Sequence, residues 1–285
     1  MRRFANVLLF TAMWTLRAPA VWAEPPDNAA VLYYKASLMY KEPEGALREA
    51  VSDASAGKHP PTQDVIDFVR DQGDAIETVT RAAEIEACNW GYDYSQGFAL
   101  QMPALAHMRN LARLVLADAA IQVDQGRYDV AIQRYRTTYA MARHVKTDHL
   151  LVCHLVGIAI EALTHGNMTH LLSQMPPEPA RLDRLDALLA EVQARSPQMY
   201  LCVAREAEIV GRYTSAEQIR EALGGEISEQ AAAPWDQEAF EKAMQYYQTR
   251  MKEMAEAFRL PYKEATAKIE AIEQQIEKDA DAKTP

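Results

Sequence analysis

The sequence predicts an all-α fold, and three observations lead to that prediction. Glycine is scarce, with 11 residues in a chain of 285, and none occurs after Gly225. Alanine, leucine, glutamate and glutamine, which favour helices, are abundant. Apolar residues recur at the spacing of a helix in nearly every segment, and no long run alternates with the period of two that a strand requires. We therefore expect an irregular body of helical hairpins followed by a long C-terminal helical arm.

Residues 1–23 have the pattern of a secretory signal peptide. Arg2 and Arg3 precede an apolar run over residues 4–16, and Val21–Ala23 is typical of a cleavage site. The apolar run is shorter than the ~20 residues that a membrane-spanning helix needs. We expect export to the periplasm, the cell envelope or the exterior, with no transmembrane span in the mature chain.

The helices of an N-terminal body are expected over residues 24–174. Asp27 can cap a first helix that runs to Pro43, and Thr62 can cap a long helix whose apolar stripe reaches Ala83. That long helix stops before the aromatic stretch CNWGYDYSQG. Three further helices are expected at Pro103–Gln125, Tyr128–Val145 and His149–Leu172.

Prolines separate a second group of helices, expected over residues 180–225. The proline-rich stretch Met175–Pro179 closes the first body, and Pro197 divides one amphipathic helix from the next. Ser215–Gly224 is expected to form a short helix, because its first and fourth residues match a capping box and its last suits a C-terminal cap.

The C-terminal arm, residues 235–282, has the sharpest apolar pattern in the chain. Charges fill the positions between its apolar residues, as in the seam of a coiled coil. Pro261 is expected to kink or break the helix, because its ring removes a backbone hydrogen bond. The arm could fold back onto the body, pair with another chain, or be disordered. Its apolar residues recur in steps of four and three at Phe240, Met244, Tyr247, Met251, Met254 and Phe258.

Gly126–Tyr135, with the sequence GRYDVAIQRY, resembles the turn and second helix of a tetratricopeptide repeat. Gly126, Tyr128, Ala131 and Tyr135 have the spacing by which such repeats pack paired helices. No second copy recurs about 34 residues away, so the resemblance implies one repeat-like hairpin and not a solenoid. Three positions depart from the repeat pattern, namely Gln122, Thr138 and Arg143.

A longer stretch, roughly Asn28 to Leu189, is similar to a group of uncharacterised exported helical proteins typical of planctomycete-type bacteria. The similarity rests on the sequences NAAVLYYKA, CNWGYDYSQG, HMRNLARLVLADAA and LVGIAIEAL. It implies export and a helical fold. It implies no activity.

The charge and cysteine content exclude several classes of function. The formal net charge of −10 disfavours nucleic acid and anionic lipid as partners. Cys88, Cys153 and Cys202 permit one disulfide in an oxidising compartment, but the sequence does not select among the three pairings. The chain has no CxxC pair, so neither a zinc knuckle nor a thioredoxin-like motif is present, and we expect no cofactor.

The helix expected at residues 149–172 contains the residues best suited to a metal. His154, Glu161 and His165 share one face of it, and imidazole and carboxylate groups are ligands for zinc or iron. The two histidines are separated by ~16 Å of helix, so a single ion could be shared only by Glu161 and His165.

A buried ion pair is the favoured interpretation of Glu161. An unpaired carboxylate on so apolar a helix would be costly, so it needs a cationic partner. Arg113 is the expected partner, with Arg109 as the alternative. The two histidines would then be hydrogen-bonded residues of the core or its boundary.

The stretch CNWGYDYSQG allows two interpretations. In the functional one, Trp90, Tyr92 and Tyr94 stack on a ligand such as a sugar ring or a peptide, while Asp93 forms hydrogen bonds with it. In the structural one, which we favour, the stretch is a connection between helices that Trp90 pins to the core.

No motif for catalysis is evident, because no serine lies in a GxSxG elbow and paired carboxylates point apart on their helices. We expect an exported interaction or scaffold protein of the cell envelope. It would bind a protein partner through the repeat-like hairpin or the arm. The alternative is a ligand-binding protein or enzyme with a pocket near Trp90, Tyr92, Asp93, His154 and Glu161. A structural component that self-assembles through the arm is the third interpretation.

Overall fold

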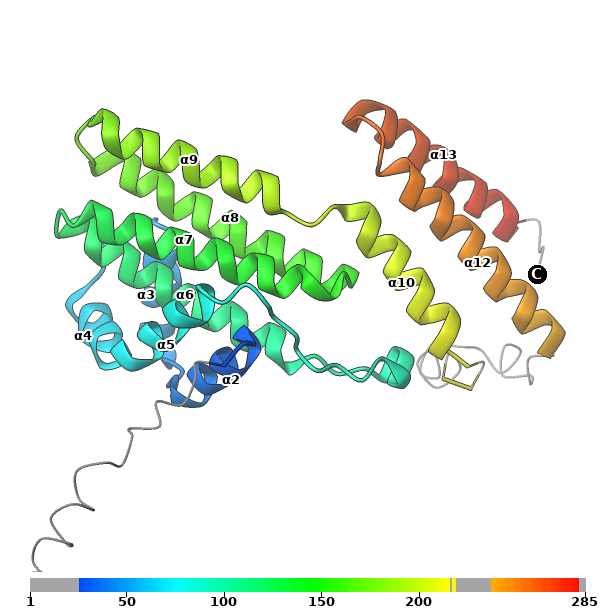
Figure 1. Ribbon diagram of the computed structural model, residues 1–285, viewed down its shortest axis with the longest axis horizontal. Helices are drawn as coiled ribbons and strands as arrows, with labels where there is room; N and C mark the ends of the chain where they lie inside the picture. Colours follow the sequence, from blue (N-terminus) through cyan, green and yellow to red (C-terminus); the bar gives the residue numbers. More distant parts are fainter. Residues whose placement is uncertain (1–25, 216, 219–236, 282–285) are drawn as a thin grey trace, which may run out of the picture.

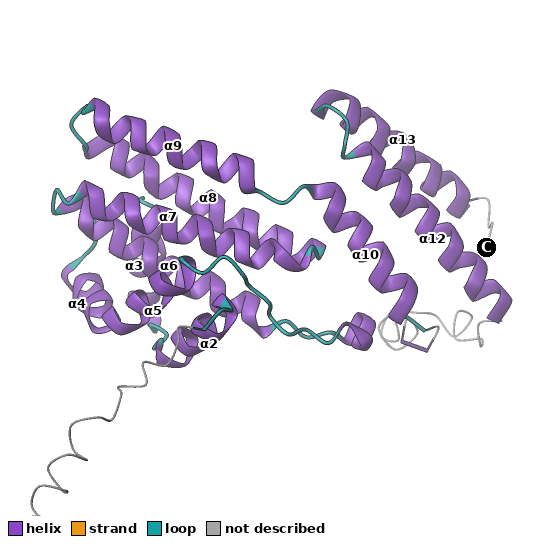
Figure 2. Cartoon of the chain, in the orientation of Figure 1, coloured by secondary structure: helices purple, strands orange, loops and turns teal. Residues whose placement is uncertain are grey.

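The computed structural model describes residues 26–215, 217–218 and 237–281, and all regular structure in these ranges is helical (Figure 2). The all-α prediction is therefore confirmed for the described part of the chain. Helices α2 to α9 form a packed body, and α10 leads from it to the helical pair α12 and α13 (Figure 1). The expected signal peptide at residues 1–23 lies outside the described residues.

Four short helices form the N-terminal part of the body. They are α2 (Ala29–Met39), α3 (Gly45–Ser55), α4 (Gln63–Asp71) and α5 (Gly73–Ala83). Asn28 caps α2 in place of the expected Asp27, because its side chain accepts a hydrogen bond from Ala30 N at 3.1 Å. The chain is already extended at Tyr40, so this helix ends before the predicted Pro43.

The long helix predicted from Thr62 to Ala83 is instead two helices. Thr62 caps α4 as expected, with its hydroxyl 3.4 Å from Val65 N. The interruption is at Gln72, whose backbone leaves helical geometry. Its side chain is buried and accepts a hydrogen bond from Lys41 N at 3.0 Å. One apolar stripe in the sequence thus belongs to α4 and α5, which a tertiary hydrogen bond separates.

Three long helices form the centre of the body, namely α6 (Pro103–Asp124), α7 (Tyr128–Val145) and α8 (Leu151–Gln174). Most of α6 from Leu111 to Val123 is buried, and it packs against α2, α3, α4, α5, α7 and α8. Pro103 begins α6, and Gly126, with φ +72°, reverses the chain into α7. The hairpin expected here is present, and its likeness to a tetratricopeptide repeat stays a prediction.

By length and composition, α8 is the one described helix that could cross a membrane. In this fold one side of it packs against α6 and α7, and 39% of its most apolar 18-residue stretch is buried. Length and composition alone therefore do not identify it as a membrane span.

The remaining helices are α9 (Pro179–Arg195), α10 (Met199–Tyr213), α12 (Gln237–Ala257) and α13 (Tyr262–Asp281). α9 packs against α7, and α12 packs against α10. α13 turns back along α12 after a break at Pro261, where the sequence predicts one (Figure 1). Ser215 and Gln218 form the predicted capping box, with Gln218 N 3.2 Å from Ser215 Oγ, although the helix it would begin lies mostly outside the described residues.

The arm thus forms a helical hairpin against α10 of its own chain. All six residues of the predicted seam, from Phe240 to Phe258, are half-buried. In α13, Ala265 and Ile272 are buried, whereas Tyr262 beside the turn is exposed. The sequence left three alternatives for the arm: packing on the body, pairing with another chain, or disorder. The described residues follow the first in part, because the arm packs on α10 of its own chain.

Asn167 of α8 connects three other helices at the centre of the body. Its side chain is fully buried, and Nδ2 lies 3.0–3.1 Å from the carbonyl oxygens of Ala54, Ser55 and Leu116. Its Oδ1 accepts a hydrogen bond from the Tyr135 hydroxyl at 2.9 Å. One amide therefore satisfies carbonyl groups at the end of α3 and in α6, and also holds α7.

We predict that Asn167→Leu lowers the free energy of unfolding by about 2–4 kcal/mol, because it removes the buried hydrogen bonds of this amide and places a branched apolar side chain among carbonyl oxygens. Urea denaturation followed by circular dichroism measures the change. Asn110→Leu is the control, since Asn110 is half-buried and contacts only Arg113 of its own helix in the described structure. Equal losses in the two variants would contradict the role of Asn167.

Candidate functional site

A pocket of about 260 Å³ lies between α5, α7 and α9. We call it the charged groove. One face of α7 forms its floor, since residues three, four and seven positions apart on a helix share a face. The end of α5 and the segment after it form one wall, and α9 forms the other. The floor consists of Gln133, Arg136, Thr137, Ala140 and Arg143, and the walls include Ala83, Glu84, Glu86, Leu188, Glu191, Val192 and Arg195.

A chain of ion pairs runs along the edge of the charged groove. Arg143 Nη1 lies 3.0 Å from Glu86 Oε1, and Arg195 pairs with the second oxygen of the same carboxylate. Arg195 also contacts Glu191 at 3.1 Å, and Glu191 in turn lies 3.9 Å from Arg136. Three arginines alternate with two glutamates along this rim, and Glu84 is a further carboxylate in the lining of the same pocket. The hydrogen bond from Arg195 and the charge of Arg143 hold the pKa of Glu86 below its usual value.

Glu161 lines the inner end of the groove and pairs with Lys146, at 2.6 Å from Nζ to Oε1. The predicted partners, Arg113 and Arg109, were wrong. Arg113 lines a separate cavity between α3 and α6, and its guanidinium donates to Asn110 Oδ1. Lys146 follows the last residue of α7 and is 1% exposed. The sequence analysis identified Glu161 as needing a cation, but it did not identify the cation.

Gly157 makes the burial of Lys146 possible. A Cβ atom at this position would lie 2.6 Å from both Cγ and Cε of Lys146. The lysine side chain therefore crosses α8 where α8 has no side chain, one turn before Glu161. A glycine four residues before a glutamate in the apolar sequence LVGIAIEAL was the available signal for this arrangement.

Tyr139 adds an unpaired hydroxyl to the groove. It lines the pocket, its residue is 4% exposed, and its hydroxyl has no hydrogen-bond partner within the described residues. Burial and the nearby charge of Glu161 raise the pKa of Tyr139, so the hydroxyl stays protonated and can donate. The hydroxyl oxygen is itself enclosed, so it is a buried polar group of the groove wall and not part of its open surface.

Two contacts have the distance expected of a nucleophile and a base, but neither suits catalysis. Lys146 Nζ donates a hydrogen bond to Ser196 Oγ at 3.4 Å and is engaged by Glu161 at 2.6 Å, so it is not placed to accept the serine proton. Cys202 Sγ lies 3.2 Å from His154 Nδ1, where burial raises the pKa of the thiol and lowers that of the imidazole. Both members of the second pair are buried, so we interpret it as a core contact.

The candidate metal residues are not gathered into a site. Within the described residues, no group of three His, Cys, Asp or Glu side chains is placed to hold an ion. Glu161 is engaged by Lys146, and the His165 ring lies 5.6 Å from the Tyr139 ring. The three cysteines are free thiols, so none of the alternative disulfides forms in this structure.

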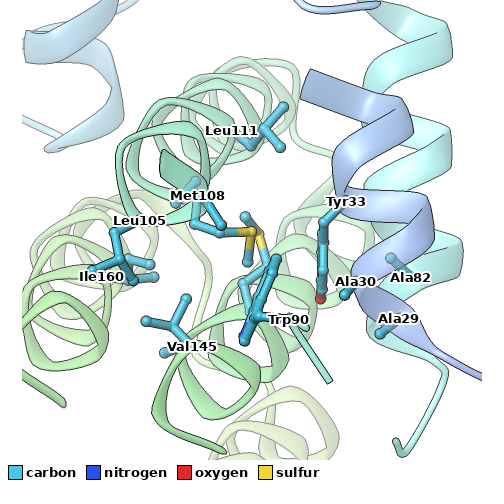
Figure 3. Packing of buried hydrophobic residues seen from close by; sticks show 14 of the residues in the cluster. Ala29, Ala30, Tyr33, Ala82, Trp90, Leu105, Met108, Leu111, Val145 and Ile160 are labelled. Carbon is cyan, nitrogen blue, oxygen red and sulfur yellow. The ribbon is translucent and has the colours of Figure 1, made fainter. Parts of the chain in front are cut away.

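Trp90 of the aromatic stretch lies in the core (Figure 3). Its ring stacks on Tyr33 with centroids 5.7 Å apart, and its Nε1 donates to His144 O at 2.9 Å. These contacts are those of a structural anchor, and a core ring of this kind is not free to stack on a ligand. Met108 and Leu111 of α6 belong to the same buried cluster as Trp90, and Met108 is the nearer of the two (Figure 3).

The other three residues of the proposed platform each have different contacts. The Tyr94 hydroxyl donates to Asp148 Oδ1, whose pKa burial raises. Asp93 is exposed and caps the short helix η1 (Tyr94–Ala99) by accepting from Ser95 N at 3.1 Å. Tyr92 is half-buried, and its hydroxyl has no partner within the described residues. None of the aromatic-stretch residues lines the charged groove, and neither does His154. Of the residues in the predicted pocket, only Glu161 lines it.

No protein-family model, curated protein or solved structure matches this chain.

His144 links the Trp90 core to the charged groove and gives a pH-dependent prediction. Arg143 Nη2 lies 3.1 Å from its Nε2 and can only donate, so Nε2 accepts and Nδ1 donates to the Tyr33 hydroxyl at 2.9 Å. Burial, with the charge of Arg143, lowers the pKa of His144 to about 4. The unfolded chain, with a histidine pKa of about 6.5, binds this proton more readily.

The contribution of neutral His144 to stability is therefore complete above pH 6.5 and is lost as the pH falls toward 4. Between pH 7.5 and pH 5, we expect the free energy of unfolding to fall by about 2 kcal/mol through this group. Urea denaturation of the native protein and of His144→Gln at both pH values isolates the effect from that of His154. An equal pH dependence in both proteins would contradict it.

Proposed function

We propose that this chain is an exported binding protein without catalytic chemistry, and that the charged groove takes a segment of a protein partner. The observation that carries the proposal is the composition of the groove. Ala140, Leu188 and Val192 offer apolar surface, and the arginines of the rim offer N–H donors and positive charge. A polypeptide segment with an apolar side chain beside an acidic group complements both.

The size of the groove favours part of a polypeptide over a large free ligand. Its volume of about 260 Å³ is below the ~300–1,000 Å³ of most small-molecule pockets. One or two side chains of a bound segment fill such a space, and the rest of the segment lies along α5 and α9. Export is part of the proposal and rests on the pattern of residues 1–23.

Selection of peptides from a displayed random library against the purified protein tests this function. We expect selected peptides to be enriched in Asp or Glu beside an apolar residue. We expect Arg136→Ala to weaken their binding about tenfold, a change of about 1.4 kcal/mol, in fluorescence anisotropy.

The matched control is Arg184→Ala. Arg184 lies near the start of α9 and pairs with Asp129 of α7 outside the groove, and its side chain is about as exposed as that of Arg136, 52% against 58%. Library selection without enrichment, or equal affinity in both variants, would rule out the groove as the docking site.

Self-association is a second candidate function, and the outer face of α8 favours it. Exposed residues recur there in steps of four and three, with Leu155 and Ile158 toward one end, Ala162 near the middle and Leu172 at the other end. In an antiparallel pair of two α8 helices, Ala162 would meet its own copy and Leu155 would face the smaller Thr169. Large side chains then lie opposite small ones, and no charge is buried.

We expect Leu155→Glu to convert a dimer of this kind into a monomer in sedimentation-velocity runs over a range of concentrations, because it places two carboxylates in the seam. Leu182→Glu is the control, since Leu182 is an exposed leucine on α9, away from the α8 face. A native protein that stays monomeric at its highest soluble concentration would exclude this second function.

A further inference from the structure

Glu86 is held in an unusual way for an exposed residue. Its side chain is 74% exposed, yet each of its two carboxylate oxygens pairs with a different arginine. Arg143 reaches it from α7 and Arg195 from α9, so the carboxylate closes one end of the charged groove. Glu86 itself lies after the end of α5, outside any helix.

Both arginines are positioned by contacts that do not involve Glu86. Arg143 is only 17% exposed in its side chain, and its second terminal nitrogen donates to His144 Nε2 at 3.1 Å. Arg195 contacts Glu191, one turn earlier in α9, at 3.1 Å. Each guanidinium group therefore keeps a contact of its own if the Glu86 carboxylate leaves, and together they form a site for a carboxylate.

Exchange of Glu86 for another carboxylate requires little from the rest of the protein. Ion pairs with one highly exposed partner contribute little net stability, because water and salt compete with them. Glu86 is not part of a helix, and its side chain is exposed, so displacement of the side chain need not move a helix or the core. Ala140, Leu188 and Val192 lie in the same pocket, so a carboxylate joined to an apolar group fits the groove better than a bare inorganic anion.

We propose that Glu86 is an internal occupant of a carboxylate-binding site formed by Arg143 and Arg195, and that the ligand enters by displacing it. The ligand class is an organic carboxylate with an apolar group beside it. This inference rests on the proposed function in that the acidic group of the partner segment is the displacing carboxylate. Glu86 thereby sets the affinity of the groove, since it competes with every ligand.

Phenylacetate is a suitable probe, because it carries one carboxylate beside one apolar ring, and phenylacetamide is its neutral counterpart. Glu86→Gln removes the internal competitor, so we expect it to bind phenylacetate more tightly than the native protein in NMR or calorimetric titrations. If Glu86 occupies the site for about nine-tenths of the time, its removal tightens binding about tenfold. Arg195→Ala, combined with Glu86→Gln, should abolish this gain, and phenylacetamide should bind to none of the proteins.

Glu84→Gln is the matched control. Glu84 lines the same pocket and carries the same charge, but no ion pair engages it within the described residues. Removal of the Glu84 charge changes the electrostatic field of the pocket by about as much as removal of the Glu86 charge does. It leaves the Glu86 carboxylate between the two arginines. The proposal is overturned if Glu86→Gln binds phenylacetate no better than Glu84→Gln while its thermal unfolding midpoint matches that of the native protein.

The outcomes separate this inference from the proposed function. Tighter phenylacetate binding by Glu86→Gln without any selected peptide would support the carboxylate site and overturn the polypeptide partner. Selected peptides whose affinity is the same for the native protein and Glu86→Gln would support the partner and overturn the role of Glu86.

Discussion

The ion pair between Lys146 and Glu161 is the interaction on which the groove and the helices around it depend. A lysine ammonium buried between α7 and α8 is tolerated only with a carboxylate in contact, and removal of either partner leaves an uncompensated charge. The pair fixes the end of α7 against α8, where Gly157 leaves room for the lysine chain. Lys146 also donates a hydrogen bond to Ser196, just beyond α9. The Lys146–Glu161 pair therefore contacts both the inner end of the groove and the end of the wall that α9 forms.

The aromatic stretch and the charged groove share the chain segment that follows α5. Trp90 holds the segment after α5 to the core through His144, and His144 holds Arg143 at the rim. The segment that Trp90 anchors also carries Glu86 into its position between two arginines. The residues that the sequence suggested as a platform thus support a site whose surface lies elsewhere. A neutral His144 is part of that support, because a protonated ring would face the Arg143 guanidinium.

The arrangement separates the two faces that we propose as binding surfaces from the elements that stabilise the fold. α6 is enclosed by its neighbours and has more buried residues than any other described helix. Asn167 of α8 hydrogen-bonds carbonyl oxygens of both α3 and α6. α7 and α8 each pack one face against α6 and leave the other outward. The outer face of α7 becomes the floor of the charged groove, and the outer face of α8 becomes an apolar stripe.

The sequence by itself determined the helical class and most helix ends, because proline, glycine and capping residues act through the local backbone. Pro103, Gly126, Thr62 and Pro261 mark ends or turns where the sequence predicts them. It also indicated that Glu161 needs a cation. Only the tertiary structure decided that the cation is Lys146, that Gln72 divides the helix after Thr62, and that Glu86 meets Arg195 across 109 positions of sequence. Such pairings depend on where whole helices cross, and no local propensity specifies that.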